Sequence, residues 1–159
     1  MKRVLFVAIF ALVSISADTF ARDARPTCFA HDGLPDPVCT PGAVFKEVTA
    51  DDVCRHGYTA EVRHVTDATR RKVFALYGVI SHPRGVYEVD HHIPLELGGS
   101  NAIANLWPEP AEPLPGFHQK DRVENYLHRE VCAGRMRLEE AQRRIAKDWR
   151  AIYRQIYGE

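Results

Sequence analysis

Residues 87–124 read YEVDHHIPLELGGSNAIANLWPEPAEPLPGFHQKDRVE, and this stretch decides the fold of the chain. It opens on a short aromatic and β-branched run, so residues 86–89 are predicted to form a strand. A second short extended piece is expected at residues 104–107. The pair Gly98-Gly99 lies between the two pieces and breaks the chain there. This arrangement predicts a strand pair with a turn that contains glycine.

A helix is expected immediately downstream of the strand pair. Residues 108–117 are rich in proline and predict a loop, so the second strand should end at Pro108. Residues 119–131 follow with Val123 and Leu127 spaced for one buried helix face. The order of strand, turn, strand, loop and helix predicts a ββα unit at about residues 86–131.

Five sequence elements inside this unit resemble the signature of the HNH nucleases, also called ββα-metal nucleases. They are Asp90-His91, Pro94-Leu95, Gly98-Gly99, Asn105-Leu106 and His118 with the following Lys120. Five matched elements in the right order make a chance agreement improbable. Residues 54–58 and 131–134 are also similar, more loosely, to exported bacterial members of the family, which extends the resemblance over most of the chain.

The resemblance implies a metal-dependent hydrolysis of phosphodiester bonds. His91 corresponds to the general base, which takes a proton from water. Asp90 and His118 correspond to the ligands of one divalent metal ion, which stabilises the charge that develops on the phosphate. Mg²⁺ is the expected ion, although a carboxylate with an imidazole also suits Mn²⁺, Ni²⁺ or Zn²⁺. Asn105 corresponds to the residue of the catalytic unit that ties the loop between the strands together.

Some side chains in this region have two interpretations. His92 competes with His91 as the base, and the family match favours His91. Lys120 and Arg122 are candidates for contacts with substrate phosphates, because Arg122 lies one helical turn beyond His118, but both also fit ordinary solvated charges.

The first 21 residues have the pattern of a cleaved export signal. A basic start and an apolar run are followed by Thr19-Phe20-Ala21, which provides small residues at the cleavage positions. Nothing after Val13 is apolar enough to span a membrane. We therefore expect a periplasmic or secreted protein.

All four cysteines lie in the exported part of the chain, where an even count predicts two disulfides. Sequence alone permits three pairings. We favour Cys28 with Cys39 and Cys54 with Cys132, because closing these loops would stabilise the fold by roughly 3 and somewhat over 4 kcal/mol.

The expected fold class is α+β, a single mature domain in which further helices pack on the ββα unit. Residues 22–66 are expected to form an N-terminal segment stapled by disulfides, and residues 67–159 the HNH nuclease domain. A helix should begin after Thr66, and an apolar stripe at spacings of three and four predicts a last helix over residues 138–157. Trp107 and Trp149 are expected in the core.

Charge alone does not identify a partner, because the chain has 21 basic and 21 acidic residues. The prediction of function therefore depends on the motifs alone. They predict an exported endonuclease that acts on DNA, with RNA as a second substrate class. The rival hypothesis is a non-catalytic envelope binding protein that keeps the same unit as a metal-stabilised module. The sequence does not indicate the oligomeric state.

Overall fold

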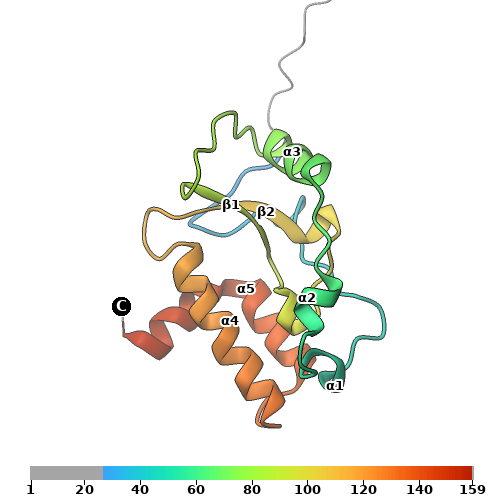
Figure 1. Ribbon diagram of the computed structural model, residues 1–159. Helices are drawn as coiled ribbons and strands as arrows, with labels where there is room; N and C mark the ends of the chain where they lie inside the picture. Colours follow the sequence, from blue (N-terminus) through green and yellow to red (C-terminus); the bar gives the residue numbers. More distant parts are fainter. Residues whose placement is uncertain (1–26, 159) are drawn as a thin grey trace, which may run out of the picture.

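The structure of the chain is a computed structural model, which describes residues 27–158. The expected export signal, residues 1–21, lies outside the described residues. The fold is α+β, as predicted: a two-stranded sheet lies between α3 on one side and α4 and α5 on the other (Figure 1). The elements in chain order are α1 (Ala50–Val53), α2 (Tyr58–Val62), α3 (Asp67–Leu76), β1 (Tyr87–His91), η1 (Leu95–Leu97), η2 (Ile103–Asn105), β2 (Leu106–Pro110), α4 (Phe117–Cys132) and α5 (Leu138–Tyr157).

The two strands pair in an antiparallel register that sets Asp90 opposite Trp107 and His91 opposite Leu106. The second strand is longer than expected, because it continues through Pro108 to Pro110. The prediction that Pro108 ends the strand was wrong. Strand β2 pairs with β1 alone in the described part of the chain, so a proline can turn its missing N–H toward the unpaired edge.

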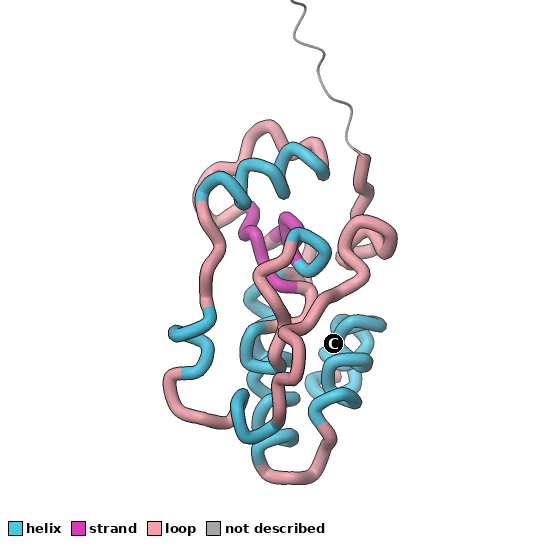
Figure 2. Tube along the Cα trace, turned by 90° about the vertical axis from the view of Figure 1, so that its right-hand side faces the viewer, coloured by secondary structure: helices cyan, strands magenta, loops and turns pink. Residues whose placement is uncertain are grey.

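Helices cover the hairpin from two sides, as the view from a second direction also shows (Figure 2). Helix α3 packs on both strands, and α4 packs against α5. The Thr66 side chain accepts a hydrogen bond from the Thr69 N–H and so caps α3 as expected. The start of α4 lies near the end of β1, because the Lys120 ammonium of α4 donates to Asp90 Oδ2 at 2.6 Å.

One hydrophobic cluster joins most of these elements. It contains the buried faces of α4 and α5, with Val123, Leu127, Ile145 and Trp149 at their centre, and it includes residues from α1 and α2. Trp107 is also fully buried. The expectation that both tryptophans lie in the core is confirmed, and neither ring is available to stack on a base.

The last helix is interrupted within its predicted span. Asp148 has φ −170° and ψ 92°, outside the helical region, and its carboxylate accepts a hydrogen bond from the Ala151 N–H at 2.9 Å. Asp148 therefore caps the second half of α5 from inside the helix. The apolar stripe does not reveal the interruption, because Trp149 and Ile152 still fall on the buried face.

Two disulfides join the N-terminal segment to itself and to α4. Cys28 pairs with Cys39 and Cys54 with Cys132, which is the favoured pairing. The capping box of Thr49 and Asp52 starts the short helix that places Cys54. No helix in residues 27–158 has the length and apolar character needed to cross a bilayer.

Candidate active site

Asn105 holds the loop between the two strands in a closed shape. Its side chain is fully buried. The amide oxygen accepts from the Ile93 N–H at 2.9 Å, and the amide nitrogen donates to the carbonyls of Ile93 and Ser100, each at 2.9 Å. The structure thus places Asn105 where the expected architectural role requires it.

Gly99 allows this loop to close. A Cβ atom at Gly99 would lie 1.7 Å from the Ile93 carbonyl oxygen, so no other residue fits without moving the backbone. The glycine pair in the sequence therefore marks a close approach of two backbone segments, in addition to a turn.

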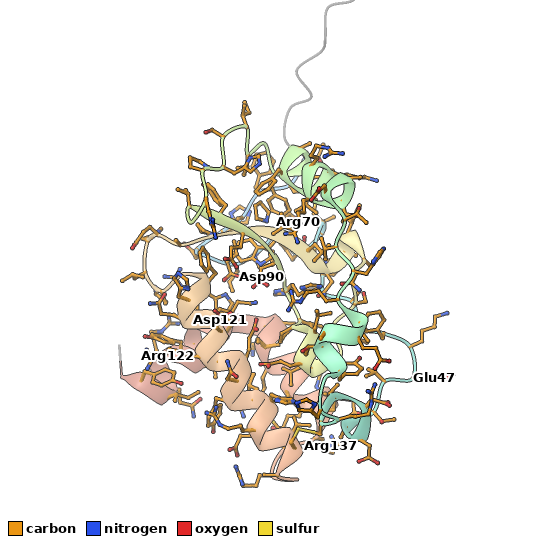
Figure 3. All side chains as sticks on the ribbon, in the orientation of Figure 1. Glu47, Arg70, Asp90, Asp121, Arg122 and Arg137 are labelled. Carbon is orange, nitrogen blue, oxygen red and sulfur yellow. A yellow bond between two sulfur atoms is a disulfide. The ribbon has the colours of Figure 1, made fainter. Side chains whose placement is uncertain are left out.

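A cleft of about 340 Å³ opens beside the exposed side of β1. Asp90 and His91 both line it. Figure 3 shows Asp90 between Arg70, which comes from α3, and Asp121, which comes from α4. The complete lining is Arg63, Val65, Arg70, Phe74, His82, Tyr87, Glu88, Val89, Asp90 and His91. The expected base and one expected metal ligand therefore share a single opening.

The His91 ring is held at one nitrogen by Asn101. The Asn101 oxygen lies 3.1 Å from His91 Nε2 and also accepts from the His64 N–H, while its nitrogen donates to the Val62 carbonyl at 2.8 Å. An amide oriented in this way can only accept from the imidazole, so Nε2 carries the hydrogen. The lone pair is then on Nδ1. Burial lowers the pKa of His91, which keeps the ring neutral at pH 7.

His92 lies in different surroundings. It is buried against a separate cavity of about 400 Å³, whose walls include Pro35, Pro37 and Pro41. Burial lowers its pKa to about 4. His92 does not line the cleft of Asp90 and His91, which favours His91 of the two candidate bases.

Lys120 does not lie on the surface, and the interpretation of Lys120 as a phosphate contact was wrong. Its side chain is 0% exposed. The ammonium donates to Asp90 Oδ2 at 2.6 Å, to the His91 carbonyl at 2.9 Å and to Glu124 Oε1. Glu109 Oε2 lies 3.5 Å away. The Lys120 ammonium is thus buried among carboxyl groups from both strands and from its own helix.

The charges of this cluster follow from burial and from one ammonium group. Burial has the largest single effect and would raise the pKa of Asp90, but the Lys120 ammonium and the hydrogen bonds from Glu109 and the His91 backbone together lower it to about 2. Burial raises the pKa of Glu124 to about 8 and that of Glu109 well above its usual value. At neutral pH, Asp90 and Lys120 are therefore charged, whereas most of Glu124 is protonated. Asp90 is the carboxylate of the cluster that stays anionic beside the cleft.

The raised pKa of Glu124 predicts a pH dependence of stability. The protonated form is favoured in the fold, so its contribution is complete below about pH 4.5 and is lost as the pH rises through about 8. Urea unfolding at pH 5, 7 and 9 should show stability falling over this range, and Glu124→Gln should flatten the fall. Exposed Glu139 provides the control, because Glu139→Gln should keep the wild-type dependence. If the free energy of unfolding changed with pH identically in wild type and Glu124→Gln, the raised pKa of Glu124 would be contradicted.

His118 occupies the first turn of α4, where its ring is exposed and lies against Phe117. Glu88 and Asp121 belong to the same electrostatic neighbourhood. Burial and the Asp90 charge raise the pKa of both carboxyls, and His118 lowers both. Carboxylate oxygens and an exposed imidazole nitrogen are donor types that suit a divalent cation, although no three ligand atoms of these residues lie close together in the described chain.

Arg122 points toward α5. Its guanidinium lies 3.7 Å from the centre of the Tyr157 ring and donates to the Tyr153 hydroxyl at 3.1 Å. In Figure 3, Arg122 lies on the side of Asp121 away from Arg70. Arg122 does not line the cleft, and its proposed contact with substrate phosphates remains a prediction.

The one group of three possible metal ligands that lie close together in residues 27–158 is elsewhere. It consists of Cys54, His128 and Cys132. The two cysteines form a disulfide, so their sulfurs are not thiolate ligands. The expected ligands Asp90 and His118 belong to no such group of three in that range.

Sequence reasoning missed Arg63, Arg70 and Glu88, which line the cleft. It also missed Asn101, which contacts the His91 ring, and Glu109, which lies near the Lys120 ammonium. Glu88 had a detectable signal, because strand alternation places it on the same face as Asp90. No family model, curated protein or solved structure matches this chain. The resemblance to the HNH nucleases therefore stays a prediction from the sequence motifs.

Proposed function

We propose that the chain is an exported, metal-dependent endonuclease of the HNH type that hydrolyses the phosphodiester bonds of DNA, and also of RNA, with little sequence specificity. The observation that carries the proposal is the shared cleft. It combines a neutral His91, whose Nδ1 is left as the acceptor, with an Asp90 that stays anionic.

In this proposal, His91 Nδ1 removes a proton from the water that attacks the phosphorus atom. Asp90 and His118 would hold one divalent ion, and Mg²⁺ is the expected ion. The bound ion supplies charge stabilisation for the phosphate and the leaving oxygen. Lys120 fixes the Asp90 carboxylate through Oδ2, and Asn105 keeps the loop closed behind His91.

Cleavage of supercoiled plasmid tests the proposal. Residues 22–159, with both disulfides formed, should not nick DNA in EDTA and should nick it when Mg²⁺ or Mn²⁺ is restored; Ni²⁺ and Zn²⁺ test the choice of ion. His118→Ala should lose both metal affinity, measured by titration calorimetry, and cleavage. A folded protein that binds metal but cleaves with none of these ions would instead indicate the metal-stabilised binding module.

We also infer that Asn101 is a positioning residue for His91. Asn101→Ala should lower kcat by about tenfold with KM unchanged, because the ring loses the acceptor that fixes its tautomer. Asn101→Asp should restore most of the rate, since a carboxylate oxygen still accepts from Nε2. Nitrogen chemical shifts of His91 should report a mixed tautomer only in Asn101→Ala. An unchanged His91 tautomer in Asn101→Ala would contradict the positioning role of Asn101.

A further inference from the structure

The residues expected to meet substrate phosphates are not in the cleft, so another source of positive charge is needed there. Lys120 is buried among carboxylates, and Arg122 lies against the rings of α5. The cleft lining instead contains two arginines, Arg63 and Arg70, which no motif indicated. Arg63 directly follows α2, and Arg70 lies in α3. Both approach the cleft from elements other than β1.

These two arginines are available to an anion. Both residues are exposed. Within residues 27–158, Arg63 has no ion pair within 4.0 Å, and the one that Arg70 makes, with Asp67, is at 4.0 Å. Other arginines are committed: Arg55 pairs with Glu61 at 2.8 Å, for example. The cleft therefore holds guanidinium groups whose hydrogen-bonding capacity is largely unused.

Electrostatic coupling places both arginines near the candidate site. Burial is the main cause that lowers the pKa of His91, and the positive charge of Arg63 adds to it. Burial raises the pKa of Glu88, and Arg70 opposes that rise. Figure 3 shows Arg70 beside Asp90. The positive edge of the cleft thus reaches the strand that carries the expected base.

The cleft has two chemically different sides. Glu88 and Asp90 come from β1, and their carboxylates would repel a phosphate unless a cation lies between. The arginines face that strand, and a guanidinium presents paired donors that match phosphate oxygens. The imidazole of His82, stacked on Phe74 with ring centres 3.9 Å apart, adds a flat aromatic surface in the same lining. Phosphates and bases together are the features of a nucleic-acid strand.

We propose that Arg63 and Arg70 form the substrate-binding edge of the cleft and hold backbone phosphates of a nucleic-acid strand on either side of the bond that faces His91. The position of the scissile bond rests on the proposed nuclease function. The binding edge itself does not depend on that function, because it requires only a polyanionic strand.

Binding without cleavage tests this edge directly. A fluorescein-labelled single-stranded DNA of about 20 nucleotides is titrated in EDTA with the wild-type chain, and fluorescence anisotropy gives Kd at several salt concentrations. Arg63→Ala and Arg70→Ala should each raise Kd by about tenfold and reduce the salt dependence by about one counterion. Arg71→Ala is the matched control, since Arg71 is exposed on the same helix and does not line the cleft. Thermal unfolding confirms that each variant is folded.

The outcomes separate the binding edge from the nuclease. Weaker binding by Arg63→Ala and Arg70→Ala, with Arg71→Ala unchanged, supports the edge even if the wild type cleaves nothing with any metal ion. Equal losses in all three variants would overturn it, because general surface charge would then explain binding. Undiminished binding by Arg63→Ala and Arg70→Ala would also overturn the binding edge. Cleavage by the wild type would in that case still support the proposed nuclease function.

Discussion

Replacing His91 by alanine is expected to reduce the rate of phosphodiester cleavage by about 10²- to 10⁴-fold, the usual contribution of a positioned general base. The lost group is the Nδ1 lone pair, since Nε2 is occupied by Asn101 and His91 lines the same cleft as Asp90. Metal affinity should be retained, because the expected ligands are Asp90 and His118. Single-turnover cleavage of plasmid, with calorimetric titration of Mn²⁺, measures both quantities.

His92→Ala is the matched control for this experiment. His92 is the neighbouring residue and is equally buried, but it borders the proline-lined cavity instead of the cleft. The variant should lose some stability and keep the cleavage rate of its folded fraction. If His92→Ala abolished cleavage and His91→Ala did not, His92 would be the base and the assignment would be reversed.

Replacing Lys120 by alanine is expected to destabilise the fold by about 3–5 kcal/mol, because the change leaves a buried anionic carboxylate without its counter-ion. Asp90 loses a 2.6 Å ion pair, and the carboxyls of Glu109 and Glu124 lose the only ammonium near them in the described chain. Urea unfolding at pH 7 measures the change. A variant that does not fold also satisfies the prediction.

Lys147→Ala provides the comparison, since Lys147 is an exposed lysine on α5 and its loss should change stability by less than about 0.5 kcal/mol. Lys120→Met tests the charge separately from the packing volume and should remain strongly destabilised. A loss below about 1 kcal/mol in Lys120→Ala would contradict the prediction, because Asp90 would then be neutralised by protonation at little cost.

Much of the fold could be predicted from local patterns. The cap at Thr66, the heptad-like spacing in α5 and the glycine pair before Asn105 each indicate an element through residues close together in sequence. The course of β2 through Pro108 could not be predicted, because a proline is tolerated there only if one edge of the strand is unpaired. That edge is a property of the assembled sheet.

The candidate site, like the fold, could be predicted from the sequence only in part. Asp90, His91 and Asn105 lie within one local motif, so the sequence could identify them together. The burial of Lys120 depends on Glu109, eleven positions earlier and on another element, which the helix pattern does not include. Arg70 reaches the cleft because α3 packs on the hairpin, and Arg63 reaches it from the end of α2, which packs on η1. A lysine in a neutral sequence is expected on the surface, and only the tertiary structure shows the opposite.

The two ends of α4 have separate tasks. His118 lies in its first turn and Cys132 is its last residue, so the rise of a helix puts about 21 Å between them. Reduction of the Cys54–Cys132 disulfide frees the end of α4 that is remote from the cleft. The unfolded chain then regains the conformational entropy that loop closure removes, which lowers the stability of the fold by about 4 kcal/mol. A disulfide reductant should therefore lower the stability of the folded protein without altering the chemistry of those molecules that remain folded. Oxidation of the cysteine pairs is therefore expected to set how much folded protein exists, and under the proposed function the cleft sets the cleavage rate of each folded molecule.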